Sequence, residues 1–183
     1  MKNTVKFLVS IIICEAAGAV GSIFTAPEIK EWYATLAKPA INPPNWIFGP
    51  VWTTLFILMG ISLYLVWSKN FKVVPASAKA MAWRGNPWNK YSQKFYSGSW
   101  QKANVIIIFS LQLFLNILWS VIFFGFHQTG IAFFELLMLW FAILYVIVNF
   151  YRISKPSAYL LIPYLLWVSF AGFLNLSIWL LNL

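Results

Sequence analysis

Five apolar segments, each long enough to cross a lipid bilayer, constrain this chain more than any other feature. A transmembrane helix needs about 20 consecutive, mostly apolar residues. The segments cover approximately residues 5–24, 46–67, 103–126, 131–151 and 157–181. A backbone in lipid must satisfy its hydrogen bonds internally, so these segments form helices. The sequence therefore predicts an all-α fold, an integral membrane bundle of five transmembrane helices forming one domain over residues 1–183.

The low content of charged residues supports this prediction. Only 9% of the residues are charged and 61% are hydrophobic, whereas a soluble domain carries about 25% charged residues. The first apolar segment resembles a signal peptide in having Lys2 and Lys6 nearby. It is long, however, and Glu15 interrupts it, so we interpret it as a retained helix.

The connections between the segments differ in length and character. Residues 25–45 contain four prolines, Pro27, Pro39, Pro43 and Pro44, and such a stretch cannot form one continuous helix. Residues 68–102 form a long, polar and basic loop. The remaining turns, at residues 127–130 and 152–156, are short, which predicts that the last three helices are antiparallel neighbours.

The basic residues predict an orientation in the membrane. All 13 Lys and Arg residues except Lys30 and Lys38 fall at the N-terminus, in the 68–102 loop or in the 152–156 turn. Cytoplasmic loops carry the excess of Lys and Arg. We therefore expect an integral protein of the cell (inner) membrane, with the N-terminus and the 68–102 loop cytoplasmic and the C-terminus outside. The lipid bilayer is then the predicted partner, and nucleic acid is not; the loop's contact with anionic lipid head groups is a secondary possibility.

Tryptophan is unusually frequent, with 11 residues. Four lie near predicted helix ends and are typical of an interfacial aromatic belt: Trp32, Trp46, Trp67 and Trp179. Four others lie deeper, where each indole N–H needs a partner: Trp52, Trp119, Trp140 and Trp167. These deeper indoles indicate either helix packing or a binding pocket.

Polar residues share helix faces with the deep indoles. The faces comprise Trp52, Phe56 and Met59 on the second segment, Gln112, Asn116, Trp119 or Ser120, and Phe123 on the third, and Trp167, Phe170, Ala171, Leu174, Asn175 and Ile178 on the fifth. Amides within a bilayer face the bundle interior. They indicate either interhelical hydrogen bonds, worth about 0.6–2 kcal/mol each, or a central cavity suited to a large, flat aromatic ligand. The first and fourth segments are interpreted as packing and dimer surfaces.

Two carboxylates, Glu15 and Glu135, also lie within the apolar segments. An intramembrane acid is a functional hypothesis by default. Because a proton relay requires a chain of such groups, we favour isolated neutral or hydrogen-bonded acids. Near Glu15, the small residues Ala17, Gly18 and Gly21 indicate close helix packing or dimerisation.

Several chemistries are excluded by residue types alone. The chain has one Cys, Cys14, one His, His127, and no Asp. This set supplies no metal cluster, no pair of histidines for haem ligation and no Ser/His/Asp triad. A Gly-rich phosphate loop is also missing from the sequence. We therefore predict no metal and no required cofactor.

Four motifs give the chain a specific resemblance. They are Trp32-Tyr33-x-x-Leu36-x-Lys38-Pro39 followed by Pro43-Pro44, Phe48-Gly49-Pro50-Val51-Trp52-Thr53, Gln112-Leu113-x-Leu115-Asn116-x-x-Trp119-Ser120-x-x-Phe123-Phe124, and Pro163-Tyr164-x-x-Trp167-x-x-Phe170-Ala171-x-x-Leu174-Asn175. In order and spacing the chain resembles the translocator protein family, also called tryptophan-rich sensory protein or peripheral-type benzodiazepine receptor. It departs from the family at Ile41, where many members have Trp, and in its long 68–102 loop.

The resemblance implies a function. It implies a five-helix bundle, often a homodimer, with a pocket beneath the first loop that binds protoporphyrin IX or haem. The residues that correspond to the pocket are Tyr33, Trp52, Asn116, Trp167 and Ala171, and the helix faces described above add Phe56, Trp119 and Phe170. The leading hypothesis is a tetrapyrrole-binding protein with a sensory, regulatory or scavenging role. The alternatives are light-dependent porphyrin degradation, for which the resemblance implicates Trp52 and Trp167, and transport of porphyrins or lipids.

Overall fold

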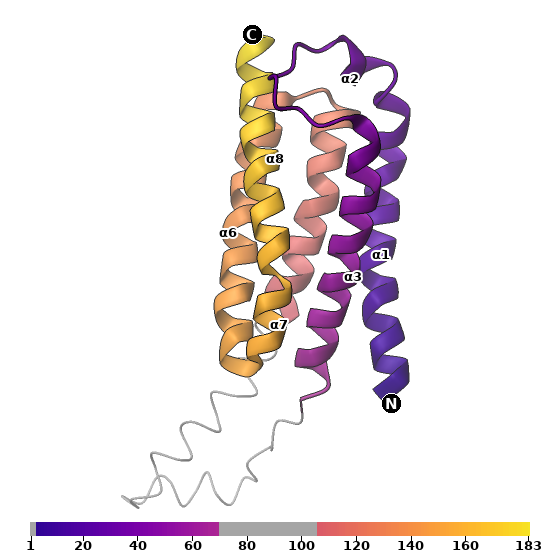
Figure 1. The fold of residues 1–183 in the computed structure, drawn as a ribbon, viewed down its shortest axis with the longest axis vertical. Helices are drawn as coiled ribbons and strands as arrows, with labels where there is room; N and C mark the ends of the chain where they lie inside the picture. The colour runs from indigo at the N-terminus through magenta and orange to yellow at the C-terminus, as the bar shows by residue number, and fades with distance from the viewer. Residues whose placement is uncertain (1–2, 70–105) are drawn as a thin grey trace, which may run out of the picture.

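Five helices are long and apolar enough to cross a membrane in the computed structural model, which describes residues 3–69 and 106–183. They are Asn3–Glu28, Asn45–Trp67, Ile106–Gly125, Thr129–Ile153 and Lys155–Leu181. Figure 1 shows them side by side, with the two termini at opposite ends of the bundle. The predicted five-helix membrane fold is confirmed. Residues 70–102 of the predicted basic loop, and residues 103–105 of the predicted third helix, lie outside the described residues.

The spans contain shorter elements, and in the part of the chain that the structure describes one short helix, α2, lies between two spans. The elements are α1 (Asn3–Glu28), α2 (Trp32–Thr35), η1 (Asn45–Ile47), α3 (Phe48–Trp67), η2 (Val121–Gly125), α6 (Thr129–Ile153), α7 (Lys155–Leu160) and α8 (Ile162–Leu181). We call Ile106–Gly125 the third span; its last five residues, η2, form a π-helix. Such turns are rare and occur frequently at functional sites.

The helix ends differ from the predicted ends by a few residues. α1 continues to Glu28 and includes Pro27, which lacks a backbone donor, and the helix stops one residue later. The predicted 152–156 turn contracts to Ser154, whose extended backbone separates α6 from α7. Pro156 then fits within the first turn of α7, where a missing N–H costs little.

Small residues hold α1 close to its neighbours. A Cβ on Gly60 of α3 would lie 2.7 Å from the Ile11 Cα atom, so the two backbones are in direct contact. A Cβ on Gly18 would meet the Phe56 ring, and one on Gly21 would lie 3.2 Å from Ser120 Oγ. Of the two interpretations left open for Gly18 and Gly21, the structure shows packing within the chain.

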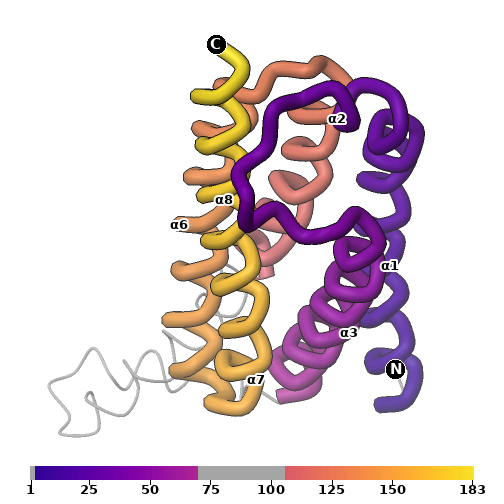
Figure 2. Tube along the Cα trace, turned by 45° about the horizontal axis from the view of Figure 1, so that its top comes forward, coloured from indigo at the N-terminus to yellow at the C-terminus, as the bar shows by residue number. Residues whose placement is uncertain are grey.

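Residues 29–44, which we call the lid, cross one end of the bundle. Figure 2 shows this segment running from the end of α1 toward α8 and returning to the start of α3. At α8 the side chain of Asn182 forms two hydrogen bonds with the Ala37 backbone, each 3.0 Å long. At the turn before α6, the His127 ring stacks on Trp32 with 4.2 Å between ring centroids, and its Nε2 lies 3.0 Å from Glu28 Oε2. The lid is therefore attached both to the end of α8 and to the turn before α6.

Candidate functional site

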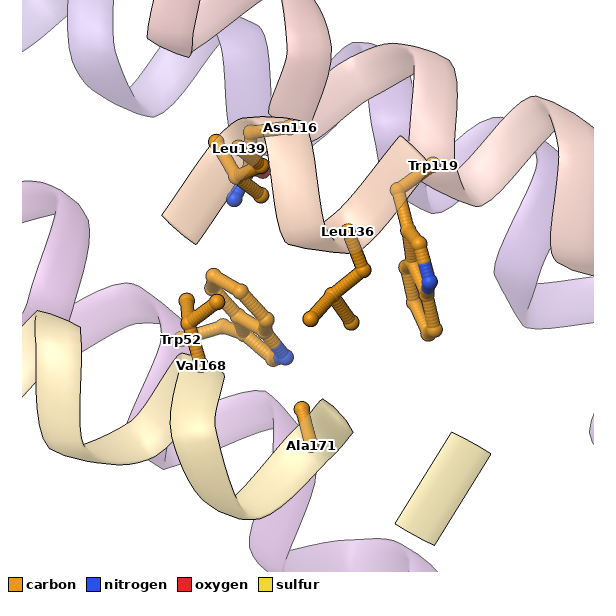
Figure 3. Close-up of a pocket in the computed structure, with 7 residues that line it drawn as sticks. All are labelled: Trp52, Asn116, Trp119, Leu136, Leu139, Val168 and Ala171. Atoms are coloured by element: carbon orange, nitrogen blue, oxygen red, sulfur yellow. The ribbon is translucent and has the colours of Figure 1, made fainter. Parts of the chain in front are cut away.

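A small cavity lies inside the bundle between α3, the third span, α6 and α8. Seven residues line it: Trp52, Asn116, Trp119, Leu136, Leu139, Val168 and Ala171. In Figure 3, Leu136 lies between the indoles of Trp52 and Trp119. The volume of the cavity is about 10 Å³, which is room for roughly one water molecule. The structure thus brings four of the eight predicted site residues to one enclosed space.

Asn116 is held by a buried polar network. Its Nδ2 donates to the Tyr164 hydroxyl at 3.0 Å, and that hydroxyl donates to Gln112 Oε1 at 3.0 Å. All three side chains are buried. The network joins the third span to α8, so the amide at the cavity wall has a fixed orientation.

Trp119 is held by a second network. Its Nε1 donates to Asn175 Oδ1 at 3.0 Å, and Asn175 Nδ2 donates to the Thr129 carbonyl at 2.7 Å. These bonds connect the third span, α8 and the start of α6. The two interpretations of the intramembrane amides are therefore compatible, because the bonds that join the helices also fix two residues of the cavity wall.

Trp52 packs between other aromatic rings. It stacks on Phe56 with 5.6 Å between centroids and meets Tyr164 edge-on at 6.2 Å. Phe56 itself is buried behind Trp52 and faces Gly18 of α1. Phe56 therefore supports the cavity wall from behind and does not line the cavity.

Trp167 and Phe170 lie next to the cavity rather than in its wall. Their rings are 5.6 Å apart, and the Trp167 ring lies 5.9 Å from Phe48 at the start of α3. The Trp167 Nε1 atom is buried and has no hydrogen-bond partner among the described residues. This indole N–H is thus available to a group that enters between α3 and α8.

Tyr33 belongs to a separate cluster beneath the lid, which also contains Phe123, Phe124, Ala132 and Ile178. The Tyr33 ring lies 6.3 Å from Phe123, which stacks on Trp119 at 5.0 Å. Aromatic rings therefore connect the lid to the cavity. The Tyr33 hydroxyl donates to Asn42 Oδ1 at 2.9 Å, and burial raises the pKa of the phenol.

Comparison with known proteins shows the family to which the chain belongs. The sequence profile described as the TspO/MBR family matches residues 10–180. The chain belongs to the TspO/MBR family. It is 38% identical over 180 residues to the Tryptophan-rich protein TspO of Archaeoglobus fulgidus, covering 98% of this chain and 99% of that protein. The resemblance described from the motifs is confirmed, and the chain is an integral membrane protein.

Proteins with other names are also similar to this chain. The Translocator protein of Homo sapiens is 37% identical over 161 residues, which cover 87% of this chain and 80% of that protein. The Tryptophan-rich sensory protein of Cereibacter sphaeroides is 27% identical over 176 residues, or 96% of this chain and 90% of that protein. The family profile matches residues 10–180, so the similarity to the family includes the spans that form the cavity.

The fourth span of this TspO/MBR protein contributes to the cavity, contrary to the prediction from sequence. Leu136 and Leu139 of α6 line it, as does Val168 of α8. Interpreting the fourth segment as a packing and dimer surface was therefore incomplete. Leu and Val occur on every face of these spans, so their residue types carry no signal, and only the packing of α6 against α8 identifies them.

A larger hollow of about 360 Å³ lies at the lid end, between the start of α6 and the end of α8. His127, Trp179 and Asn182 are among the residues that line it. It contains none of the predicted site residues and is open to the surroundings. The enclosed cavity, with its indoles and fixed amide, is therefore the candidate site.

The residues at the cavity favour binding over metal chemistry. Within residues 3–69 and 106–183, no group of three or more His, Cys, Asp or Glu side chains could hold a metal ion. The cavity offers indole faces, aliphatic side chains and one amide. Such a lining suits a flat aromatic molecule with few polar groups. The present space of about 10 Å³ holds roughly one water molecule, so a larger molecule would enter only if the surrounding side chains moved.

Proposed function

We propose that this TspO/MBR protein binds a tetrapyrrole, such as protoporphyrin IX or haem, within the membrane and has a sensory, regulatory or scavenging role. The observation that carries the proposal is the cavity that Trp52, Trp119 and Asn116 share in the bundle interior. Two indoles offer large flat surfaces to a macrocycle, and the amide offers a polar contact that orients it.

The surroundings of the cavity support a ligand larger than the present space. Trp167, Phe170 and Phe48 form a half-buried aromatic group between α3 and α8, beside Ala171 of the cavity wall. Separation of these rings would join the cavity to the indole of Trp167. The macrocycle would then pack between Trp52 and Trp167, with Tyr33 and the lid above it.

Titration of the purified protein with protoporphyrin IX tests this proposal. We expect a saturable change in porphyrin absorbance, and weaker binding in a Trp52→Phe/Trp167→Phe variant. Porphyrin absorbance is the better readout because removing two of the 11 indoles itself changes protein fluorescence. Trp46→Phe is the matched control, since Trp46 is 74% exposed. Non-saturable binding, or equal affinity in the double variant, would refute the proposed site.

Light-dependent porphyrin degradation is the second candidate, and it is favoured by the position of oxidisable indoles at the cavity wall. The complex should then lose its porphyrin absorbance under illumination faster than free porphyrin does, and only with oxygen present. Equal decay rates for bound and free porphyrin would leave binding without turnover. A third candidate, transport of porphyrins or lipids, predicts porphyrin flux into proteoliposomes that exceeds flux into protein-free vesicles.

We also propose the orientation and assembly expected from the sequence. The N-terminus and the 68–102 loop would be cytoplasmic in the cell (inner) membrane, with the lid and the C-terminus outside. The basic residues support this orientation, since only Lys30 and Lys38 lie between the first two spans. A homodimer is expected from the family resemblance, and mass measurement of the protein in detergent or nanodiscs tests it.

A further inference from the structure

Three side chains next to the cavity have buried polar atoms without a hydrogen-bond partner among the described residues. They are Gln112, through Nε2, Glu135, through both carboxyl oxygens, and Trp167, through Nε1. Gln112 and Glu135 are almost completely buried, with exposures of 1% and 3%. Leaving such atoms unpaired away from water is costly, so native proteins rarely do so without a reason.

The three residues have the same relationship to the cavity wall. Each lies four positions before a residue that lines the cavity: Gln112 before Asn116, Glu135 before Leu139, and Trp167 before Ala171. Residues four apart on a helix share a face. The unpaired polar atoms therefore extend the wall of the cavity by one turn on three different helices.

The direction of each helix divides the three residues between the two ends of the cavity. The third span and α8 run toward the lid, whereas α6 runs away from it (Figure 1). Gln112 and Trp167 consequently lie beyond the cavity on the side away from the lid, and Glu135 lies on the lid side. Along the bundle, Glu135 therefore lies nearer the lid than Gln112 does.

We infer that Gln112 and Glu135 determine ligand specificity at this site, and that Trp167 assists Gln112. The ligand presents a hydrogen-bond acceptor, such as a carboxylate or carbonyl, to the donors Gln112 Nε2 and Trp167 Nε1. It presents a donor, such as an N–H group, to the Glu135 carboxyl. A flat molecule with an acceptor edge and an N–H group has this chemistry, as a metal-free porphyrin acid does, whose N–H groups are reached through the face of the macrocycle. The inference rests on the proposed function and adds residues that select the ligand.

Glu15 provides a matched comparison on the same protein. It is also an acid within a span, and its Oε1 atom is buried without a partner among the described residues. It comes from α1, however, which contributes none of the residues that line the cavity. A general effect of removing an intramembrane acid would appear at Glu15 and Glu135 alike, whereas an effect on the ligand would appear only at Glu135.

The test for Glu135 is titration of the protein in nanodiscs with protoporphyrin IX, combined with thermal unfolding of the ligand-free protein. We expect Glu135→Leu to raise the unfolding temperature, since it removes unpaired polar atoms, and to weaken binding about tenfold or more. Glu135→Gln keeps a carbonyl acceptor and should recover most of the affinity. Glu15→Leu should bind as the wild type does.

Each outcome separates this inference from the proposed function. Wild-type affinity in Glu135→Leu overturns the inference. Loss of both stability and affinity in Glu135→Leu, without recovery in Glu135→Gln, also overturns it, because it indicates a structural role. No saturable binding by the wild type overturns the proposed function itself.

A second variant tests the acceptor edge of the ligand. Gln112→Leu removes the unpaired donor, together with the oxygen that accepts from the Tyr164 hydroxyl. We expect about tenfold weaker binding of protoporphyrin IX, whose carboxylate would lose this donor, and a smaller loss for its dimethyl ester. Equal affinity of Gln112→Leu and the wild type for both compounds would overturn the role of Gln112.

Discussion

Asn182 and Ala37 form a reciprocal pair that ties the lid to the end of α8. The Ala37 N–H donates to Asn182 Oδ1, and Asn182 Nδ2 donates to the Ala37 carbonyl, at 3.0 Å in both cases. The same Nδ2 atom also donates to the Ile178 carbonyl at 2.7 Å, which orients the side chain from within α8. One amide therefore satisfies both backbone groups of a residue 145 positions away in the chain.

Asn182→Leu should loosen the lid without disturbing the spans. Both bonds to Ala37 are lost, and because they are exposed we expect the free energy of lid opening to fall by only about 1 kcal/mol. Hydrogen exchange of residues 29–44 should become faster, with exchange in α3 and α6 unchanged. Ser177→Ala is the control, since that exposed hydroxyl bonds only to the Phe173 carbonyl of its own helix. Unchanged exchange in Asn182→Leu would show that other contacts hold the lid.

Gly60→Ala should destabilise the contact between α1 and α3. The new methyl group would lie 2.7 Å from the Ile11 Cα atom, so a backbone must move. We expect a loss of about 1–3 kcal/mol in the free energy of unfolding. Gly49→Ala on the same helix meets nothing within 4 Å and should change stability by less than about 1 kcal/mol. Equal unfolding temperatures for the two variants would contradict the close approach.

Asn175→Leu should destabilise the wall of the cavity. It leaves the Trp119 indole N–H and the Thr129 carbonyl without the partners that Asn175 supplies. Two interhelical bonds within the membrane correspond to about 1–3 kcal/mol. Ser169→Ala removes a single bond from Trp140 and should cost about 0.6 kcal/mol. Chemical or thermal unfolding in nanodiscs measures both, and a larger loss in Ser169→Ala would contradict the assignment.

Tyr33 should make the closed lid sensitive to alkaline pH. Burial raises the pKa of its phenol, so folded Tyr33 holds its proton more tightly than unfolded Tyr33. Its contribution to stability is complete below the ordinary tyrosine pKa of about 10 and declines as the pH rises above that value. The difference in unfolding temperature between the wild type and Tyr33→Phe should shrink or reverse from pH 9 to about pH 11. A difference that stays constant with pH would argue against a buried phenol.

The proposed orientation predicts the labelling of introduced cysteines. Cys14 is the only cysteine in the sequence and is buried, so the wild-type background is low. Ala34→Cys in the lid and Asn3→Cys at the opposite end both place a thiol at an exposed position. In intact cells, a membrane-impermeant thiol reagent should label Ala34→Cys and not Asn3→Cys. The reverse pattern would invert the orientation.

The residue types at the candidate site could be predicted from the sequence more completely than their positions around the cavity. Gln112, Asn116 and Trp119 are recognisable because amides and indoles are rare at membrane depth and share one helix face. The structure places Asn116 and Trp119 at the cavity, but Phe56 behind its wall and Tyr33 in the separate cluster beneath the lid. Periodicity identifies the face of a helix, whereas the position of a side chain within that face depends on how neighbouring helices approach.

The sequence by itself determined the number of spans, because about 20 apolar residues in a row have one stable arrangement in lipid. It also determined that the amides Gln112, Asn116 and Asn175 would face the bundle interior. Only the tertiary structure decided that α6 supplies Leu136 and Leu139 to the cavity, and that Asn182 meets Ala37. The physical reason is that burial in lipid is a property of each segment alone. The cavity and the attachment of the lid instead arise from contacts between segments far apart in the chain. Such contacts cannot be inferred from residue type and spacing.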